Sequence, residues 1–81
     1  MRSIETIRDR IAKLYVTHPD VHINISMTSP KVSVRNEPVR ITGVYPHLFR
    51  IEEKNTGVPR SFTHRYTDLL TGRVEIAELG L

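Results

Sequence analysis

Residues 43–51 constrain the fold more than any other part of the sequence, because a single proline interrupts their apolar and aromatic run. Pro46 cannot donate a hydrogen bond to a strand neighbour, and it disfavours a helical conformation at Tyr45. Gly43 has no Cβ, which permits a kink or the close approach of a neighbouring strand. The run therefore predicts a strand, a sharp corner at Pro46 and a second strand. Strands that bend in this way are typical of small closed barrels.

A helix is predicted for residues 3–15. Ser3 is a suitable N-cap, and the helix must end before Pro19, since a residue that precedes proline avoids the helical conformation. Apolar residues recur at helical spacing on one face of the segment and predict a buried stripe: Ile4, Ile7, Ile11 and Leu14.

Short strands are predicted for the rest of the chain. Residues 21–28 alternate between apolar and polar side chains, as in a half-buried strand, and residues 29–31 break it. Residues 32–37 are either the tip of a long hairpin or a short strand. The remaining strands are predicted at 39–44, 48–52, 59–66 and 73–76. Turns are predicted at 54–57 and at the helical segment 67–72, which Gly72 closes, and the chain is expected to fray at 77–81.

The expected fold is mainly β. An N-terminal α-helix is followed by a five-stranded, strongly bent antiparallel small barrel of the Sm-like or SH3-like kind, with the helix over one open end. A chain of 81 residues predicts one domain, residues 1–81.

Several chemistries find no support in the sequence. Cysteine is absent, and no glycine-rich phosphate loop or nucleophile elbow occurs. His18, His22 and His64 are interpreted as surface or partly buried polar residues, not as metal ligands or catalytic bases. We therefore expect no enzyme activity, no cofactor and no metal. No apolar run is long enough to cross a membrane, and a cytoplasmic location is expected.

Basic residues concentrate in the middle of the chain. Residues 31–65 hold seven lysines and arginines against three glutamates, whereas the last sixteen residues are acidic. An anionic partner, RNA or DNA, would therefore bind the middle segment. The candidate nucleic-acid-binding residues are Lys31, Arg35, Arg40, Arg50, Arg60 and Arg65.

A protein interface is the competing hypothesis. Leu48 is predicted to face outward beside Tyr45, and two apolar side chains next to a bend would form a contact patch. The alternative for Leu48 is that it packs under the helix. A free edge strand would also pair with a second copy of the chain. The partner in this hypothesis is a homo-oligomer or a regulatory protein.

Two blocks of sequence resemble the Veg family, small proteins of Gram-positive bacteria. Residues 43–49 are similar to that family's G-x-x-x-Y-P-S-x-F region, with one residue fewer after the glycine. Residues 61–71 are similar to its tyrosine-rich strand followed by Y-[SA]-D-[VI]-L-T. The order of helix, strands and blocks agrees over most of the chain.

The resemblance implies a small cytoplasmic, non-enzymatic regulatory protein with a barrel fold, linked to transcription of biofilm matrix genes. Two departures stand out. His47 replaces the usual serine after the proline, and the family's Gly-Gly-Arg-Arg-Lys type loop corresponds here to residues 29–35, which hold only Lys31 and Arg35 as basic residues. If that loop binds an anionic partner in the family, this chain would bind it weakly or not at all.

Overall fold

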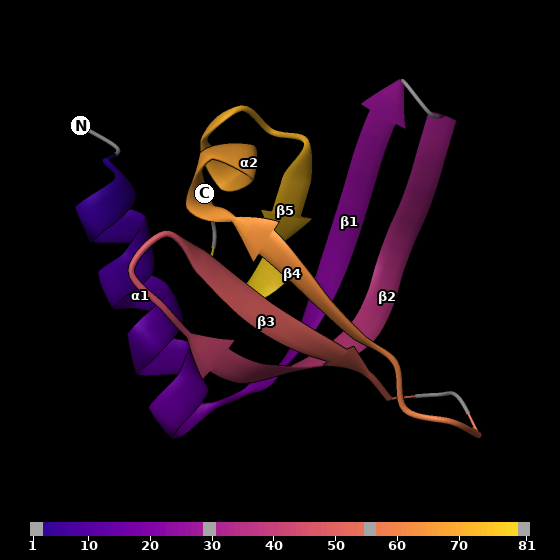
Figure 1. Cartoon of the computed structure of the whole chain (residues 1–81), viewed down its shortest axis with the longest axis horizontal. Coiled ribbons are helices and arrows are strands. Elements are labelled where there is room, and N and C mark those ends of the chain that lie inside the picture. The colour runs from indigo at the N-terminus through magenta and orange to yellow at the C-terminus, as the bar shows by residue number, and fades with distance from the viewer. Residues whose placement is uncertain (1–2, 29–30, 55–56, 80–81) are drawn as a thin grey trace.

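A computed structural model of the chain describes residues 3–28, 31–54 and 57–79. A long helix is followed by five strands, with two short helical segments near the C-terminus (Figure 1). In order, the elements are α1 (Ile4–Thr17), β1 (Asp20–Thr28), β2 (Lys31–Val44), β3 (Leu48–Glu53), β4 (Ser61–Arg65), α2 (Tyr66–Leu70), β5 (Val74–Ile76) and the 3-10 helix η1 (Ala77–Leu79). The predicted break at Ser29 and Pro30 and the turn residues Asn55 and Thr56 lie outside the described residues.

The five strands form one antiparallel sheet in the order β4-β3-β2-β1-β5. The mainly β fold with an N-terminal helix is thereby confirmed. The expected closed barrel is not, because β4 and β5 stand at opposite edges and do not pair with each other. The reason lies in the last strand: β5 has three residues and pairs only with residues 23–25 of β1, so it leaves β4 without a partner on its outer side.

Helix α1 begins as predicted and ends two residues later than predicted. The Ser3 hydroxyl accepts a hydrogen bond of 3.1 Å from the Thr6 amide, which caps the first turn. Ile7 and Ile11 are fully buried, and the helix packs against β2 and α2. Ile4 is 38 % exposed, so the predicted apolar stripe is buried only from the second turn onward.

Strand β2 is much longer than predicted, because residues 31–38 and 39–44 form one continuous strand. The long-hairpin alternative for residues 32–37 is the correct one. The strand is bent where its register with β1 shifts between Ile23 and Ile25 and where its register with β3 shifts between Ile41 and Gly43. Asn36, with φ of 52°, lies at the first irregularity, and its backbone amide donates a hydrogen bond of 2.8 Å to the side-chain oxygen of Asn24.

The corner at Pro46 is confirmed. The Tyr45 amide donates a hydrogen bond of 2.9 Å to the Leu48 carbonyl, which turns the chain from β2 directly into β3. Phe49 and Ile51 then face inward as expected, and both are buried. The corner therefore fixes which side chains of β3 enter the core and which remain on the outer face.

The C-terminal part of the chain is packed, contrary to the expectation of fraying at 77–81. Leu79 in η1 is buried in the same core as Val74 and Ile76. Residues 80–81 lie outside the described residues. The predicted helical turn is present as α2, where Gly72 adopts a positive φ of 78° after the helix, but the helix begins at Tyr66, which was assigned to the strand before it.

Candidate nucleic-acid interface

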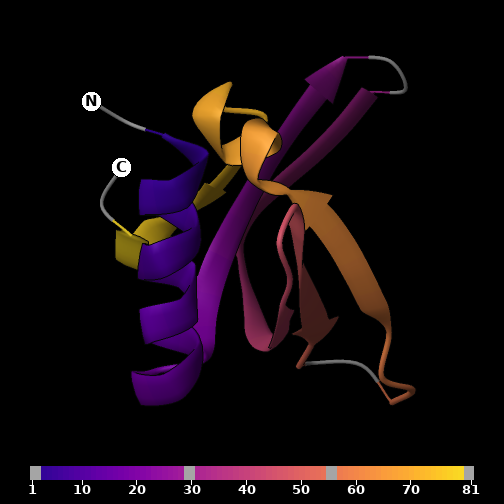
Figure 2. The ribbon, with the colours of Figure 1, turned by 60° about the vertical axis from the view of Figure 1, so that its left-hand side comes forward.

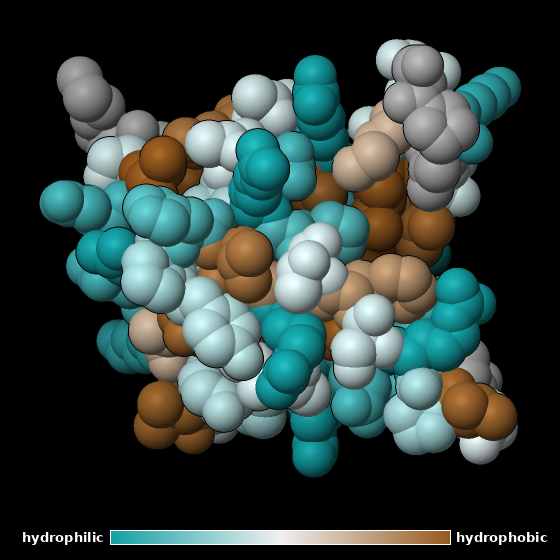
Figure 3. All heavy atoms as spheres, viewed as in Figure 1, coloured by the Kyte–Doolittle hydropathy of each residue, from teal (hydrophilic) through white to brown (hydrophobic). Residues whose placement is uncertain are grey.

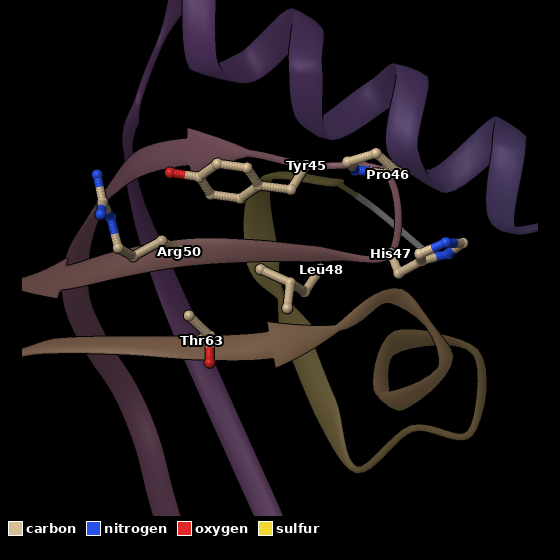
Figure 4. Close-up of a pocket in the computed structure, with 6 residues that line it drawn as sticks. All are labelled: Tyr45, Pro46, His47, Leu48, Arg50 and Thr63. Atoms are coloured by element: carbon tan, nitrogen blue, oxygen red, sulfur yellow. The ribbon is translucent and has the colours of Figure 1, made fainter.

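The outer face of β2, β3 and β4 carries a shallow hollow at the Pro46 corner, with a volume of about 470 Å³. We call it the tyrosine patch (Figure 4). It is lined by Tyr45, Pro46, His47, Leu48, Arg50 and Thr63. These side chains come from the end of β2, the corner and two neighbouring strands, so residues far apart in the sequence meet on one surface.

Tyr45 lies flat along β2 because Gly43 leaves room for its ring. A Cβ placed on Gly43 would lie 2.7 Å from Cε2 and from Oη of Tyr45, closer than side-chain atoms approach in folded proteins. The predicted close approach to Gly43 is therefore made by this side chain and not by a neighbouring strand. The ring keeps 42 % of its surface exposed and points along the strand toward Arg50 (Figure 4).

Arg50 is exposed and is held in place by the neighbouring strand. Its Nε donates to the Thr42 hydroxyl at 3.1 Å, and its Nη2 donates to the Thr42 carbonyl at 3.4 Å. No carboxylate of the described residues lies within ion-pair distance of its guanidinium. Its charge is therefore oriented beside the Tyr45 ring and is not neutralised by that part of the chain.

A second hollow of about 400 Å³ continues the patch toward α2. It shares Leu48 and Thr63 with the first and adds Arg65, which stands directly opposite Leu48 in the sheet. Asp68 also lines it, but its carboxylate accepts the Arg65 backbone amide at 3.3 Å and caps α2. Arg65 makes no ion pair within the described residues, so this hollow offers a second cation next to one acidic group.

Leu48 belongs to the outer surface. It is half-buried, lies between Tyr45 and Thr63 in the patch, and is not part of the buried core cluster (Figure 4). The alternative in which it packs under the helix does not occur. The tyrosine patch and the second hollow beside it thus combine the two residues of the predicted protein interface, Tyr45 and Leu48, with two of the predicted nucleic-acid-binding residues, Arg50 and Arg65.

The other four predicted basic residues lie elsewhere. Arg40 donates to Asp20 through Nε at 3.0 Å, and Lys54 contacts the same carboxylate at 3.2 Å. The hydrogen bond from Arg40, together with that from Lys54, lowers the pKa of Asp20 to about 2. Arg40 therefore faces solvent with its charge already compensated by Asp20.

Arg60, Lys31 and Arg35 are also separated from the tyrosine patch. The Arg60 guanidinium carbon lies 5.2 Å from the centre of the Phe62 ring, whose strand position faces the opposite side of the sheet. Lys31 and Arg35 lie on the far part of β2, beyond the residues that pair with β3. The structure therefore divides the six predicted residues over separate surfaces. The contribution of Thr63 was not foreseen, because only the β3–β4 register brings it beside Arg50. Pro46 and His47 adjoin Tyr45 in the sequence, but neither was among the predicted site residues.

Two of the four histidines, His22 and His64, make side-chain contacts within the fold. His22 Nδ1 and Glu78 Oε2 lie 2.8 Å apart, and the His22 amide donates to the same carboxylate at 2.8 Å. Burial opposes ionisation of Glu78, but the hydrogen bonds from the side chain and backbone of His22 outweigh it and lower the pKa of Glu78. Burial lowers the pKa of His64, whose ring lies 6.0 Å from that of Phe49.

Fold and surface place the chain among small, mainly β proteins built on a bent, open five-stranded sheet behind an N-terminal helix. The family model described as "Biofilm formation stimulator VEG" matches residues 2–77, nearly the whole chain. The chain belongs to the Veg family, which confirms the resemblance of its two sequence blocks and supports a regulatory role in biofilm formation. Comparison with curated proteins and with solved structures finds no match. Neither helix of the described chain has the length and apolar character needed to cross a membrane.

Proposed function

We propose that this protein regulates biofilm formation by binding single-stranded RNA or DNA on the tyrosine patch and thereby influencing transcription. It would act by binding and not by catalysis, and it would do so in the cytoplasm. The observation that carries the proposal is the position of the Tyr45 ring, exposed and flat against Gly43, beside the Arg50 guanidinium that no described carboxylate neutralises.

This arrangement matches the chemistry of single-strand recognition. Proteins that bind single strands pair an aromatic platform, on which a base stacks, with cations that follow the phosphate backbone. Tyr45 supplies the platform, and Arg50 and Arg65 supply cations from two adjacent strands on the same face. Leu48 and Thr63 lie between them and offer an apolar surface and a hydroxyl. A duplex has its bases stacked internally, so the patch favours unpaired strands.

The two basic residues of the family-type loop are not part of this surface. Lys31 and Arg35 lie on the far part of β2, whereas the patch is at the other end of that strand. The small number of basic residues in the loop therefore does not weaken the proposed site, which depends on Arg50 and Arg65.

The decisive experiment measures fluorescence anisotropy of labelled single-stranded RNA, single-stranded DNA and duplex DNA at low salt. Single strands should bind more tightly than the duplex. Tyr45→Ala should weaken single-strand binding by about 1–3 kcal/mol, the usual cost of losing one stacked base. Tyr15→Ala is the matched control, because Tyr15 on α1 is exposed to the same 42 % but lies away from the patch. Equal effects of the two substitutions, or no binding by the unaltered protein, would refute the proposal.

A further inference from the structure

We propose that two copies of this chain associate edge to edge, through antiparallel pairing of β4 with β4 of the partner copy. Within the described chain, β4 pairs on one side only, with β3. Figure 2 shows β4 at the margin of the molecule, with no strand beyond it. Each residue of β4 except His64 is exposed, and the register with β3 is regular over the whole strand. Such an edge offers unpaired N–H and C=O groups to another strand.

The backbone groups that point away from β3 follow from the hydrogen bonds between β3 and β4. The Glu53 amide donates to the Arg60 carbonyl at 3.0 Å, and the Tyr66 amide donates to the His47 carbonyl at 3.4 Å. Hydrogen-bonded pairs in an antiparallel ladder recur at every second residue. Residues 60, 62, 64 and 66 therefore turn their N–H and C=O groups toward β3, and residues 61, 63 and 65 turn theirs outward.

The part of this edge that is free to pair is short. The Arg65 amide is already used, because it donates to the Asp68 carboxylate at 3.3 Å. At the other end Pro59 has no N–H to offer. Ser61 and Thr63 lie between these limits, and neither makes a backbone hydrogen bond on the outward side within the described part of the chain.

A second copy of β4 matches this edge when the two-fold axis passes through Phe62. Ser61 of each copy then lies opposite Thr63 of the other, and each of these residues gains both backbone hydrogen bonds of a ladder pair. Pro59 comes opposite Arg65 of the partner copy, so the residue without an amide hydrogen faces the one whose amide is already used. An axis at Thr63 would instead place Ser61 opposite Arg65. The coincidence of the two ends selects a second copy over a strand of unrelated sequence.

The side chains on both faces agree with this register. On the inner face Phe62 meets Phe62 of the partner copy, at a pair without hydrogen bonds, where side chains approach most closely. Phe62 keeps 37 % of its surface exposed and lines an apolar groove of about 270 Å³ together with Val39 and Ile51. Figure 3 shows that hydrophobic side chains reach the surface along β4, among polar ones. Pairing the two rings covers exposed aromatic surface and adds the attraction between aromatic rings.

Charges do not oppose the association. On the inner face Arg60 comes opposite His64 of the partner copy, and burial lowers the pKa of His64, so that its ring is uncharged at neutral pH. On the outer face the facing side chains are the hydroxyl groups of Ser61 and Thr63. A two-fold axis through an antiparallel pair is perpendicular to the sheet, so both tyrosine patches lie on the same side of one continuous sheet and remain accessible. The association does not rest on the proposed nucleic-acid binding.

Sedimentation velocity on the full chain tests the association. The unaltered protein should sediment as a dimer at high micromolar concentration. Ser61→Pro removes an outward amide that β3 does not use, a place where edge strands tolerate proline. This variant should dimerise at least about tenfold more weakly, because each copy loses a hydrogen bond at the interface. Ser61→Ala keeps the amide and is the matched control, and Tyr45→Ala on the tyrosine patch should also dimerise like the unaltered protein. Far-ultraviolet circular dichroism verifies that each variant is folded.

Disulfide formation tests the register without relying on the proline variant. The chain has no cysteine, so Phe62→Cys introduces a single thiol. In the proposed dimer this thiol faces its own copy, with the two Cα atoms about 4.5 Å apart, which a disulfide spans. Thr63→Cys is the control, because it faces Ser61 and its two copies lie more than about 7 Å apart, beyond the reach of a disulfide.

Under mild oxidation Phe62→Cys should therefore form linked dimers at least about tenfold faster than Thr63→Cys. Three results would each overturn the proposal. The first is an unaltered protein that stays monomeric at high micromolar concentration, and the second is a folded Ser61→Pro variant that dimerises like Ser61→Ala. The third is equal crosslinking of the two cysteine variants, which decides the matter even where the proline variant does not fold.

Discussion

The hydroxyl of Tyr66 donates a hydrogen bond of 2.5 Å to the backbone carbonyl of Tyr45. Tyr66 is fully buried at the start of α2, and its ring stacks at 5.9 Å on that of Phe49. The bond therefore ties the β2–β3 corner to the core of the molecule. It also fixes the backbone of the residue whose ring forms the proposed platform for a base.

Tyr66→Phe should destabilise the protein by about 1–2 kcal/mol, because the Tyr45 carbonyl loses its hydrogen-bond donor while the ring stays in the core. Chemical denaturation followed by circular dichroism measures the change in the free energy of unfolding. Tyr15→Phe on the exposed face of α1 should leave stability unchanged. Equal stability of the Tyr66 variant and the unaltered chain would show that the bond does not hold the corner.

Gly43→Ala should displace the Tyr45 ring and destabilise the protein by at most about 1 kcal/mol, below the usual cost of overpacking a core, because the ring belongs to an exposed side chain that can move away. The added methyl group would overlap the present position of the Tyr45 ring. The backbone of Gly43 does not adopt a positive φ, so it would accept alanine without conformational strain. A double-mutant cycle separates these causes, because Gly43→Ala should cost little in a Tyr45→Ala background. Gly57→Ala is the control, since nothing lies within 4 Å of a Cβ at that position. A cost that persists without the Tyr45 ring would contradict this explanation.

Arg50→Glu should weaken single-strand binding and make it less dependent on salt. Each phosphate contact that is lost reduces the slope of log affinity against log salt by about 0.7 for single strands. Anisotropy titrations at several salt concentrations measure this slope. Arg73→Glu makes the same charge change beside β5, away from the patch, and separates a local contact from an effect of net charge. Identical slopes for the two variants would argue for net charge alone.

The carboxyl group of Asp20 should titrate with a pKa of about 2 in the folded protein, against about 3.8 when unperturbed. Since the folded pKa is depressed, the stabilisation from this group is present above the unperturbed pKa and is lost as the pH falls through the folded pKa. Carbon-13 NMR of the Asp20 carboxyl measures the midpoint. Arg40→Gln should raise it, because the hydrogen bond from Arg40 is the main cause of the shift. A midpoint that this variant leaves unmoved would rule Arg40 out as the cause.

Local signals accounted for most of the secondary structure. Ser3 and Pro19 bound the helix, Pro46 places the corner, and Gly72 follows the short helix in the conformation that glycine favours. Each of these effects acts within a few residues along the chain. The Veg membership rests on the same kind of information, because the two blocks around Pro46 and Tyr66 are continuous in sequence.

Signals between residues close in the sequence could not predict whether the sheet closes or which basic side chains lie together. Whether β4 meets β5 depends on the length of β5 and on the path through α2, and the pairing of Arg40 with Asp20 joins residues 20 positions apart. Leu79 was expected to fray and is buried, because its neighbours come from distant elements.

Periodicity, proline and glycine were thus sufficient for the mainly β fold, the N-terminal helix and the corner, since backbone preferences act on neighbouring residues. Long-range packing and strand register set the rest: an open sheet with an apolar groove, and Tyr45 over Gly43 beside Arg50. These features depend on which distant segments meet, and no local preference of the chain specifies that.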